Sequence, residues 1–467
     1  MVFSSLIFVF AFLFPSLLIY WLVPVKWRNG VLLASSLIFY AWGGLQYVLL
    51  LLFEAGISWF CALKIAHHRT QKRWYMVLEV VSLLGLLGIF KYLGFILSNI
   101  QFFIGWPSEI PQIVLPLGIS FYTFQLLSYV IDVYNGQVRA QPKYWKVLLY
   151  CSLFHQCVAG PIVRYSTVAY EIDHRSVSIN DLTKGVRRFS IGLAKKAILA
   201  NGCALIATNA LPTVANQPLL AYWLSMLAFT LQLYLDFSAY SDMAIGMGLM
   251  VGFHYLENFN YPYQAKSVQD FWRRWHISLS TFFRDYIYIP LGGSRAGSLI
   301  YIRNMVTVWF LTGLWHGASW NFILWGLYYL VFLLLERFVI QERIPKGWNV
   351  VYTLSVVFVG TTIFRFENMD ELWTVLKGLL GFGISGFSSA EVVGVFVSNL
   401  FLLIASIIGC TELSVYIRRI FAALARQNKA IWALYLIEEA LLPVILLGLS
   451  TLALVGNAYN PFLYFQF

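Results

Sequence analysis

Residues Trp309–Trp325 read WFLTGLWHGASWNFILW, an apolar stretch in which His316 stands between Trp315 and Gly317. Of the seven histidines, His316 lies deepest inside a long hydrophobic segment. A titratable imidazole in such a segment is costly unless it has a partner or faces water, so the pattern favours a functional site. The alternative is a histidine that packs between helices and is hydrogen-bonded to a neighbour.

If the whole stretch is one helix, its small and aromatic residues share a face with the histidine. Trp309, Gly313, His316, Gly317 and Trp320 would then lie on or near that face. Glycines beside the imidazole allow another backbone, or a thin substrate, to come close. We therefore expect a close neighbour at His316.

The composition is that of a membrane protein. Of the 467 residues, 60% are hydrophobic and only 11% are charged, whereas soluble proteins carry roughly a quarter charged residues. The mean hydropathy of +0.72 agrees. The formal net charge of +11 comes from basic residues in short loops between apolar stretches. This distribution follows the positive-inside rule of membrane proteins. It predicts that the basic residues contact anionic lipid rather than nucleic acid.

The apolar stretches predict an all-α polytopic membrane protein. Their order gives about eleven or twelve crossings and no separate soluble domain, so residues 1–467 are expected to form a single domain. The first crossing, Leu6–Val23, lacks a basic n-region and is expected to be a signal anchor. The stretch Tyr150–Val163 is too short to span and contains His155 before a Gly-Pro pair, which predicts a re-entrant or half helix.

Two further segments are polar enough to stand out. Glu171–Lys184 is the best candidate for an interfacial loop. Leu219–Gly252 is longer than one span and contains Asp236 and Asp242, which predicts a helix lining a cavity or wet tunnel. The two aspartates could form a proton relay, or they could be buried carboxylates bonded to Ser or Tyr.

The segment Gln269–Tyr288 has apolar residues at helical spacing, namely Phe271, Trp275, Leu279, Phe282 and Tyr286. The sequence predicts an amphipathic helix in the cytoplasmic interface, with Arg273 and Arg274 on its basic side. These arginines could bind a phosphate or pantetheine group of a donor, or they could be only a snorkelling basic face. His276 belongs to the same helix and is expected to be exposed at the boundary.

The motifs of several enzyme classes are absent. The chain has no P-loop, GxGxxG, GxSxG or HExxH, so nucleotide hydrolysis, Rossmann redox chemistry and serine-type hydrolysis lack support. The five cysteines show no CxxC and no Cys/His metal spacing, so we expect apolar fillers and no metal site.

What remains is an intramembrane histidine with scattered polar residues. A histidine can deprotonate a hydroxyl as a general base. Acyl transfer from a thioester to an alcohol needs that base, a donor that polarises the carbonyl, and exclusion of water. Asn321, Trp320 and Tyr328 are the candidate donors near His316.

Three long motifs resemble the membrane-bound O-acyltransferase family. They are DFSAYSDMAIGMGLMVGF (Asp236–Phe253), FWRRWHISLSTFFRDYIYIPLGG (Phe271–Gly293) and GLWHGASWNFILWG (Gly313–Gly326). The resemblance is to the branch of bacterial alginate O-acetylation proteins, with cellulose and cell-wall polymer relatives. The opening MVFSSLIF, the AGPIVRY at Ala159–Tyr165 and the closing PFLYFQF also look like that branch, so the resemblance covers essentially the whole chain.

The resemblance implies a bundle of membrane helices around a funnel and tunnel, in the bacterial cytoplasmic (inner) membrane. It implies transfer of an acyl group, expected to be acetyl, from a cytoplasmic thioester toward an extracellular polysaccharide such as alginate or cellulose. The donor would be acetyl-CoA or an acyl carrier thioester, with no bound cofactor. The partner would be an extracytoplasmic acetyltransferase. The resemblance also implies that the histidine of the WHG motif, here His316, is catalytic.

Two positions depart from the family's pattern. Tyr329 stands where many relatives have a second histidine in an LYH-type motif, and His155 stands where a proline or apolar residue is expected. These departures weaken a two-histidine mechanism and leave the role of His155 open. The alternative function is a polysaccharide or lipid transporter, in which His316 and the aspartates line a path. Transporters often contain inverted repeats, and we find no repeat in this sequence.

The Lys and Arg bias of four segments predicts that they are cytoplasmic: Lys64–Arg73, Lys143–Lys146, Arg337–Lys346 and Arg418–Lys429. Cysteines introduced in these segments should escape a membrane-impermeant thiol reagent added to intact cells. Strong labelling in two or more segments would overturn the predicted topology.

Overall fold

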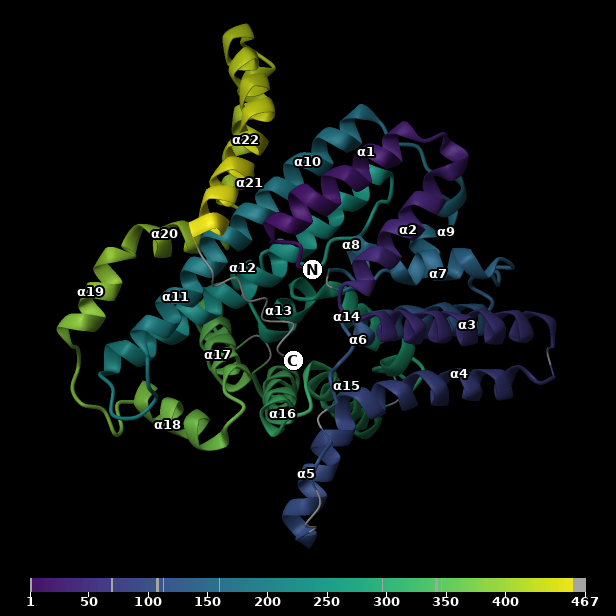
Figure 1. Cartoon of the computed structure of the whole chain (residues 1–467). Coiled ribbons are helices and arrows are strands. Elements are labelled where there is room, and N and C mark those ends of the chain that lie inside the picture. Colours follow the sequence, from purple (N-terminus) through teal and green to yellow (C-terminus); the bar gives the residue numbers. More distant parts are fainter. Residues whose placement is uncertain are drawn as a thin grey trace. The chain divides into compact units, whose positions relative to one another are not determined.

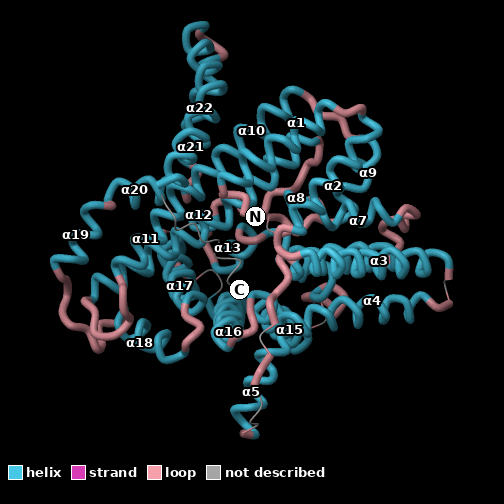
Figure 2. Tube along the Cα trace, in the orientation of Figure 1, coloured by secondary structure: helices cyan, strands magenta, loops and turns pink. Residues whose placement is uncertain are grey.

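The computed structural model describes residues 2–68, 70–105, 109–111, 113–158, 160–295, 297–340, 343–345 and 347–456. Throughout these ranges the regular elements are helices and no strand occurs (Figure 2), which confirms the all-α prediction. The closing PFLYFQF motif, Ala159 of AGPIVRY and part of Arg337–Lys346 lie outside the described residues.

Six described helices are long and apolar enough to cross a membrane, and a bent pair of shorter helices would make a seventh span. This is fewer than the eleven or twelve crossings that we expected, because several apolar stretches form shorter helices. The first stretch, for example, is an apolar helix only over Ile7–Leu22. These helices are the candidate spans of a multi-pass membrane protein.

The described chain divides into two compact units. Unit 1 consists of Met1–Phe189, Met243–Glu257 and Arg284–Tyr286, and unit 2 consists of Ser190–Asp242, Asn258–Phe283 and Ile287–Phe467. The prediction of one domain is not tested by this division. The functional histidine predicted from the sequence, His316, belongs to unit 2.

Unit 1 is built from helices in the first 189 residues (Figure 1). They are η1 (Ile7–Leu13), α1 (Phe14–Leu22), η2 (Val25–Trp27), α2 (Arg28–Ala41), α3 (Leu45–His67), α4 (Lys72–Leu87), η3 (Gly88–Tyr92), α5 (Leu93–Ile104), α6 (Ile119–Tyr134), α7 (Tyr144–Ser152), α8 (Phe154–Cys157), α9 (Tyr165–His174) and most of α10 (Ile179–Ala194). Helix α6 packs against α3 and α4 and is buried along nearly its whole length.

Glycines set two of the breaks in unit 1. Gly44, which has φ of 136°, separates α2 from α3 in the Gly43-Gly44 pair. Gly118, with φ of 74°, precedes α6, and a Cβ there would clash with the carbonyl oxygen of Cys157. Helix α8 is thereby held next to the start of α6, and its four residues fit the predicted half helix.

Unit 2 contains the remaining helices (Figure 1). They are η4 (Lys195–Ala200), α11 (Asn201–Ala210), most of α12 (Leu219–Val251), η5 (Pro262–Gln264), α13 (Val268–Arg274), α14 (Ile277–Phe283), part of η6 (Arg284–Tyr288), α15 (Ser298–His316), α16 (Trp320–Leu335), η7 (Glu336–Ile340), α17 (Trp348–Arg365), α18 (Met369–Leu379), α19 (Ala390–Ser398), α20 (Leu400–Gly409), α21 (Leu413–Ala425) and α22 (Lys429–Gly456).

The centre of unit 2 is a helical hairpin formed by α15 and α16. A Cβ on Gly313 would clash with the carbonyl oxygen of Phe322, and a Cβ on Gly326 would clash with that of Trp309. The two backbones therefore touch at these glycines, as small residues allow in membrane helices. The close neighbour expected at Gly313 is thus the other arm of the same hairpin.

Three segments differ from the sequence predictions. Glu171–Lys184 is not a loop, because α9 continues to His174 and α10 begins at Ile179. The basic segment Arg418–Lys429 is largely helical, because α21 extends to Ala425 and α22 begins at Lys429.

The third difference concerns Gln269–Tyr288, which is not one amphipathic helix. Helix α13 ends at Arg274 and α14 begins at Ile277. The break falls at His276, whose backbone has φ of 44°. A helix cannot continue through a residue in this left-handed conformation.

The hairpin contact predicts the effect of adding side-chain volume at Gly326. Gly326→Val should destabilise the protein by about 1–3 kcal/mol or more, because backbone atoms cannot move away from the new methyl groups. Thermal unfolding in detergent measures the change. The matched control is Gly448→Val in α22, where a Cβ meets nothing within 4 Å. Equal unfolding temperatures for the two variants would contradict this packing.

Candidate active site

His316 is the last residue of α15. The chain turns over Gly317–Ser319, and α16 begins at Trp320. The predicted single helical face from Trp309 to Trp320 is therefore wrong, because the stretch folds back on itself. The turn places the imidazole at the closed end of the hairpin instead of in the middle of a continuous helix.

Aromatic rings surround the His316 imidazole, which is 5% exposed. Its ring centroid lies 5.1 Å from that of Trp315, 4.7 Å from that of Trp325 and 5.4 Å from that of Phe364, all in edge-to-face geometry. The Phe322 ring lies so close to Gly317 that a Cβ there would clash with it. These contacts fix the orientation of the histidine and keep bulk water from most of its surface.

Asn321 fixes one wall of this cage. It is fully buried, and its amide nitrogen donates to the carbonyl oxygens of Ile363 and Phe364 at 3.4 and 3.2 Å. The start of α16 is thereby tied to the end of α17, which carries the Phe364 ring. Asn321 thus holds the backbone that carries the Phe364 ring against His316.

The other two candidate donors have different positions. The Tyr328 hydroxyl donates to the carbonyl oxygen of Val356 at 2.9 Å. The Trp320 side chain is 53% exposed. Because Asn321 and Tyr328 already donate to backbone carbonyls, neither is placed here as a donor to an acyl carbonyl.

A second histidine, His276, reaches the same indole as His316. The Trp315 ring lies edge-on to both imidazoles, with centroids 5.6 Å from His276 and 5.1 Å from His316. His276 is fully buried, so the prediction that it is exposed is wrong. It also packs 4.7 Å from the Phe237 ring. Its position between α13 and α14 turns the side chain inward.

The environment of His276 keeps it neutral. Burial lowers its pKa to about 3. Its Nε2 has no hydrogen-bond partner within the part of the chain that the structure describes. The apolar neighbours of His276 in the RRWHISLS motif, a tryptophan before it and an isoleucine after it, were the sequence feature that could have indicated its burial.

Tyr329 belongs to an aromatic cluster beside the hairpin. Its ring packs 4.9 Å from Trp272 and 5.3 Å from Trp325, and its hydroxyl lies against Gly360. Trp272 of α13 also contacts Trp309 of α15 at 4.8 Å. Where many relatives are expected to have a histidine, this chain therefore has a buried packing residue.

The two aspartates predicted to line a wet helix are paired with lysines. Asp236 lies 2.8 Å from the Lys196 amine, with both side chains 1% exposed, and Asp242 lies 2.7 Å from that of Lys195. Neither the proton relay nor the bonding to Ser or Tyr considered from the sequence included these lysine partners. Paired charges are expected inside a membrane protein. Each pair links α12 to η4.

The two arginines proposed for donor binding differ in exposure. Arg274 is half-buried and bonded to Asp270 at 3.0 Å, and it donates to the carbonyl oxygen of Asn260 at 3.4 Å. Arg273 is exposed. Of the two side chains, Arg273 is therefore the more accessible to a ligand.

His155 belongs to unit 1. It is fully buried in α8, and its Nδ1 lies 2.8 Å from the Tyr255 hydroxyl. Burial, reinforced by the charge of Arg175, lowers its pKa to about 3. The tyrosine contact and the neutral state fit a histidine that packs within unit 1.

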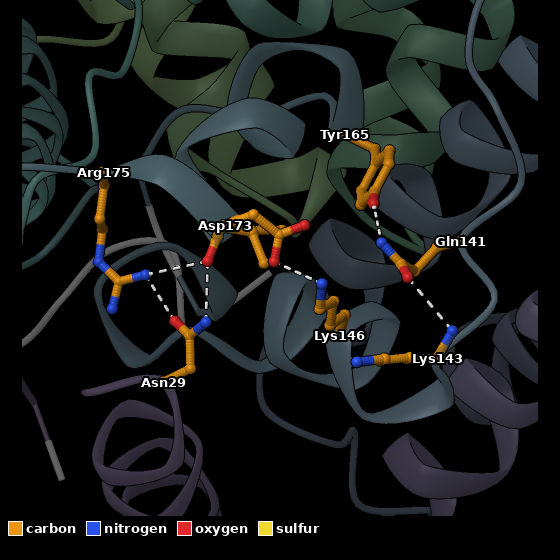
Figure 3. Close-up of polar contacts among 8 residues, drawn as sticks. Asn29, Gln141, Lys143, Lys146, Tyr165, Asp173 and Arg175 are labelled. Carbon is orange, nitrogen blue, oxygen red and sulfur yellow. Dashed lines mark hydrogen bonds and ion pairs between the residues drawn. The ribbon is translucent and has the colours of Figure 1, made fainter. Parts of the chain in front are cut away.

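Polar side chains also tie down the segment that follows α8 in unit 1. Arg175 donates to Asn29, and Lys146 is paired with Asp173 (Figure 3). Figure 3 also shows Gln141 donating to the Tyr165 hydroxyl, at 2.9 Å. Fixed contacts of this kind explain why the polar stretch after Glu171 is ordered helix with a short connection.

Comparison with known proteins shows the family to which the chain belongs. The model of the membrane-bound O-acyltransferase family matches residues 137–366, which include His276 and His316. A relative from Azotobacter vinelandii named "Probable alginate O-acetylase AlgI" is 36% identical, with 100% of both chains covered. The chain belongs to the membrane-bound O-acyltransferase family. It is therefore an acyltransferase.

Other relatives of this acyltransferase are named for acyl transfer to peptidoglycan or teichoic acid. The "Peptidoglycan O-acetyltransferase" of Helicobacter pylori is 35% identical, with 82% of this chain and 80% of the relative covered. The "Teichoic acid D-alanyltransferase" of Bacillus subtilis is 28% identical, with 50% of this chain and 61% of the relative covered. All of these names describe acyl transfer, but they differ in the acyl group and in the polymer.

The role of Asn321 can be tested without touching His316. Asn321→Leu should destabilise the acyltransferase by about 1–3 kcal/mol, because the carbonyls of Ile363 and Phe364 lose a buried donor. Acyl transfer per folded molecule should also fall, since the Phe364 ring is no longer held.

The matched control is Asn368→Leu, which removes a cap at the start of α18 instead. It should lower the unfolding temperature while leaving the acyl-transfer rate per folded molecule unchanged. Equal rates for the two variants would contradict the positioning role of Asn321.

Proposed function

We propose that this acyltransferase moves an acetyl group from a cytoplasmic thioester to the hydroxyl of an extracytoplasmic polysaccharide or partner protein, with His316 as the general base. The observation that carries the proposal is the burial of His316 within a fixed ring cage at the end of the hairpin. A base held in one orientation and shielded from water suits acyl transfer.

The proposed reaction needs one proton acceptor. The acceptor hydroxyl gives its proton to a nitrogen of His316 while its oxygen attacks the thioester carbonyl. The carbon–sulfur bond then breaks, and the proton leaves the imidazole for the departing thiolate. His276 would remain neutral beside Trp315, since burial lowers its pKa to about 3. It is available for hydrogen bonding rather than for charge stabilisation.

We propose acetyl-CoA, or an acyl carrier thioester, as the donor. Arg273 is exposed at the end of α13 and could contact a donor phosphate, while Arg274 is bonded to Asp270. Entry from the cytoplasm follows from the predicted topology, in which the basic segments face inward. No resident cofactor is part of the proposal.

For the acceptor we propose an acidic exopolysaccharide of the alginate type, with cellulose as the alternative polymer. Support comes from the names of relatives that align over the whole chain. We further propose an extracytoplasmic acetyltransferase as the partner that completes transfer, and the bacterial inner membrane as the location. The transporter alternative loses its support, because family membership accounts for the same intramembrane histidine.

His316→Ala and His316→Gln test the base. Acetyl transfer should fall by roughly two to four orders of magnitude in both, because neither side chain accepts a proton. His316→Gln keeps hydrogen-bonding capacity, so it separates proton transfer from packing. The assay measures transfer of labelled acetyl from acetyl-CoA at matched membrane levels of folded protein. Near-normal turnover in both variants would return His316 to a packing role.

A further inference from the structure

Glu336 makes a contact that the proposed chemistry does not use. It begins η7, directly after α16, and its carboxylate accepts hydrogen bonds from the backbone N–H groups of Val268 and Gln269 at 2.6 and 3.0 Å. These two residues are the first two of α13. One carboxylate therefore joins the open end of the hairpin, opposite the turn at His316, to the start of α13. The bonded residues are 68 and 67 positions apart in the chain.

The contact is not an ordinary local cap. Helix α13 already has one, because the Ser267 hydroxyl accepts from the N–H of Asp270 at 2.9 Å. The first N–H groups of a helix lack intrahelical partners. Here they receive an acceptor from another helix, which fixes the distance between the two elements as well as satisfying the donors.

The base of the hairpin is itself fixed next to Glu336. The guanidinium of Arg337 lies 3.8 Å from the ring centroid of Tyr301 at the start of α15. Two adjacent residues of η7 thus contact other helices, Arg337 contacting α15 and Glu336 contacting α13. The anchor for α13 is therefore part of a rigid end of the hairpin.

Helix α13 carries residues that reach the candidate active site. Trp272 contacts Trp309 and Trp325 of the hairpin at 4.8 and 5.5 Å. Beyond the end of α13, His276 contacts the Trp315 ring, which also contacts His316. The position of α13 along the hairpin therefore sets where Trp272 and His276 pack against Trp325 and Trp315, the two hairpin rings that contact His316.

We propose that Glu336 is a positioning residue for acyl transfer: its carboxylate sets the register of α13 against the α15–α16 hairpin and so holds His276 against Trp315, the ring beside His316. The proposal rests on the function proposed above for His316. Glu336 does not touch the reacting atoms in this account. It acts through α13, whose displacement would move the walls of the site.

The test compares Glu336→Gln with Ser267→Ala. The glutamine keeps the size of the side chain but leaves one acceptor oxygen for two N–H groups. Ser267→Ala removes a cap from the same end of α13 without breaking a link to the hairpin. Membranes that contain the full chain and its native partners are supplied with labelled acetyl-CoA, and acetyl incorporation into polymer is measured against donor concentration.

Glu336→Gln should lower the rate at saturating donor by about ten- to hundred-fold, because a small misplacement of catalytic groups has effects of this order. The donor concentration for half-maximal rate should stay unchanged. Ser267→Ala should keep the wild-type rate per folded molecule. A wild-type rate in Glu336→Gln, an equal loss in both variants, or a loss confined to donor affinity would overturn the proposal.

Two further variants keep the outcome unambiguous. Glu336→Asp retains the charge on a shorter stem and should lower the saturating rate, and if Glu336→Gln does not fold, a wild-type rate in Glu336→Asp overturns the proposal. His316→Ala tests the underlying function separately. Normal turnover in His316→Ala would contradict the general-base role. Loss of activity in His316→Ala together with full activity in Glu336→Gln would contradict only the positioning role of Glu336.

Discussion

The direct backbone contact between α15 and α16 is the constraint on which the candidate site depends. Gly313 and Gly326 face the carbonyls of the opposite arm so closely that neither position accommodates a Cβ. Without hydrophobic attraction between helices in lipid, such close packing supplies much of the association. The hairpin that results ends in the turn where His316 is buried, so the location of the histidine follows from the fit of two glycines.

The rings around His316 give the site its chemical character. Three aromatic contacts and the Gly317–Phe322 approach orient the imidazole, and Asn321 holds the Phe364 ring by backbone carbonyls. In the proposed reaction, a preorganised base in a dry surrounding needs little rearrangement when the acceptor hydroxyl arrives. The nearby Asn321 and Tyr328 side chains donate to backbone carbonyls, so the candidate site combines one imidazole with a rigid apolar frame.

Polar residues within the apolar segments follow a common rule in both units. In unit 2, Asp236 is paired with Lys196 and Asp242 with Lys195. In unit 1, His155 contacts Tyr255, and Glu79 accepts from Ser58 at 2.6 Å. Each of these four groups has a partner from another part of the same unit, which offsets the cost of burying it.

The sequence by itself determined the all-α membrane class and the acyltransferase family, and it singled out the stretch around His316, because hydropathy, charge bias and long motifs are local properties. It also located the half helix at His155. Only the tertiary structure decided that Trp309–Trp325 folds into a hairpin, that His276 turns inward, and that Asp236 and Glu336 bond to distant helices. Periodicity describes one face of one helix, whereas these features depend on which backbones touch, and partners far apart in the chain leave no local pattern.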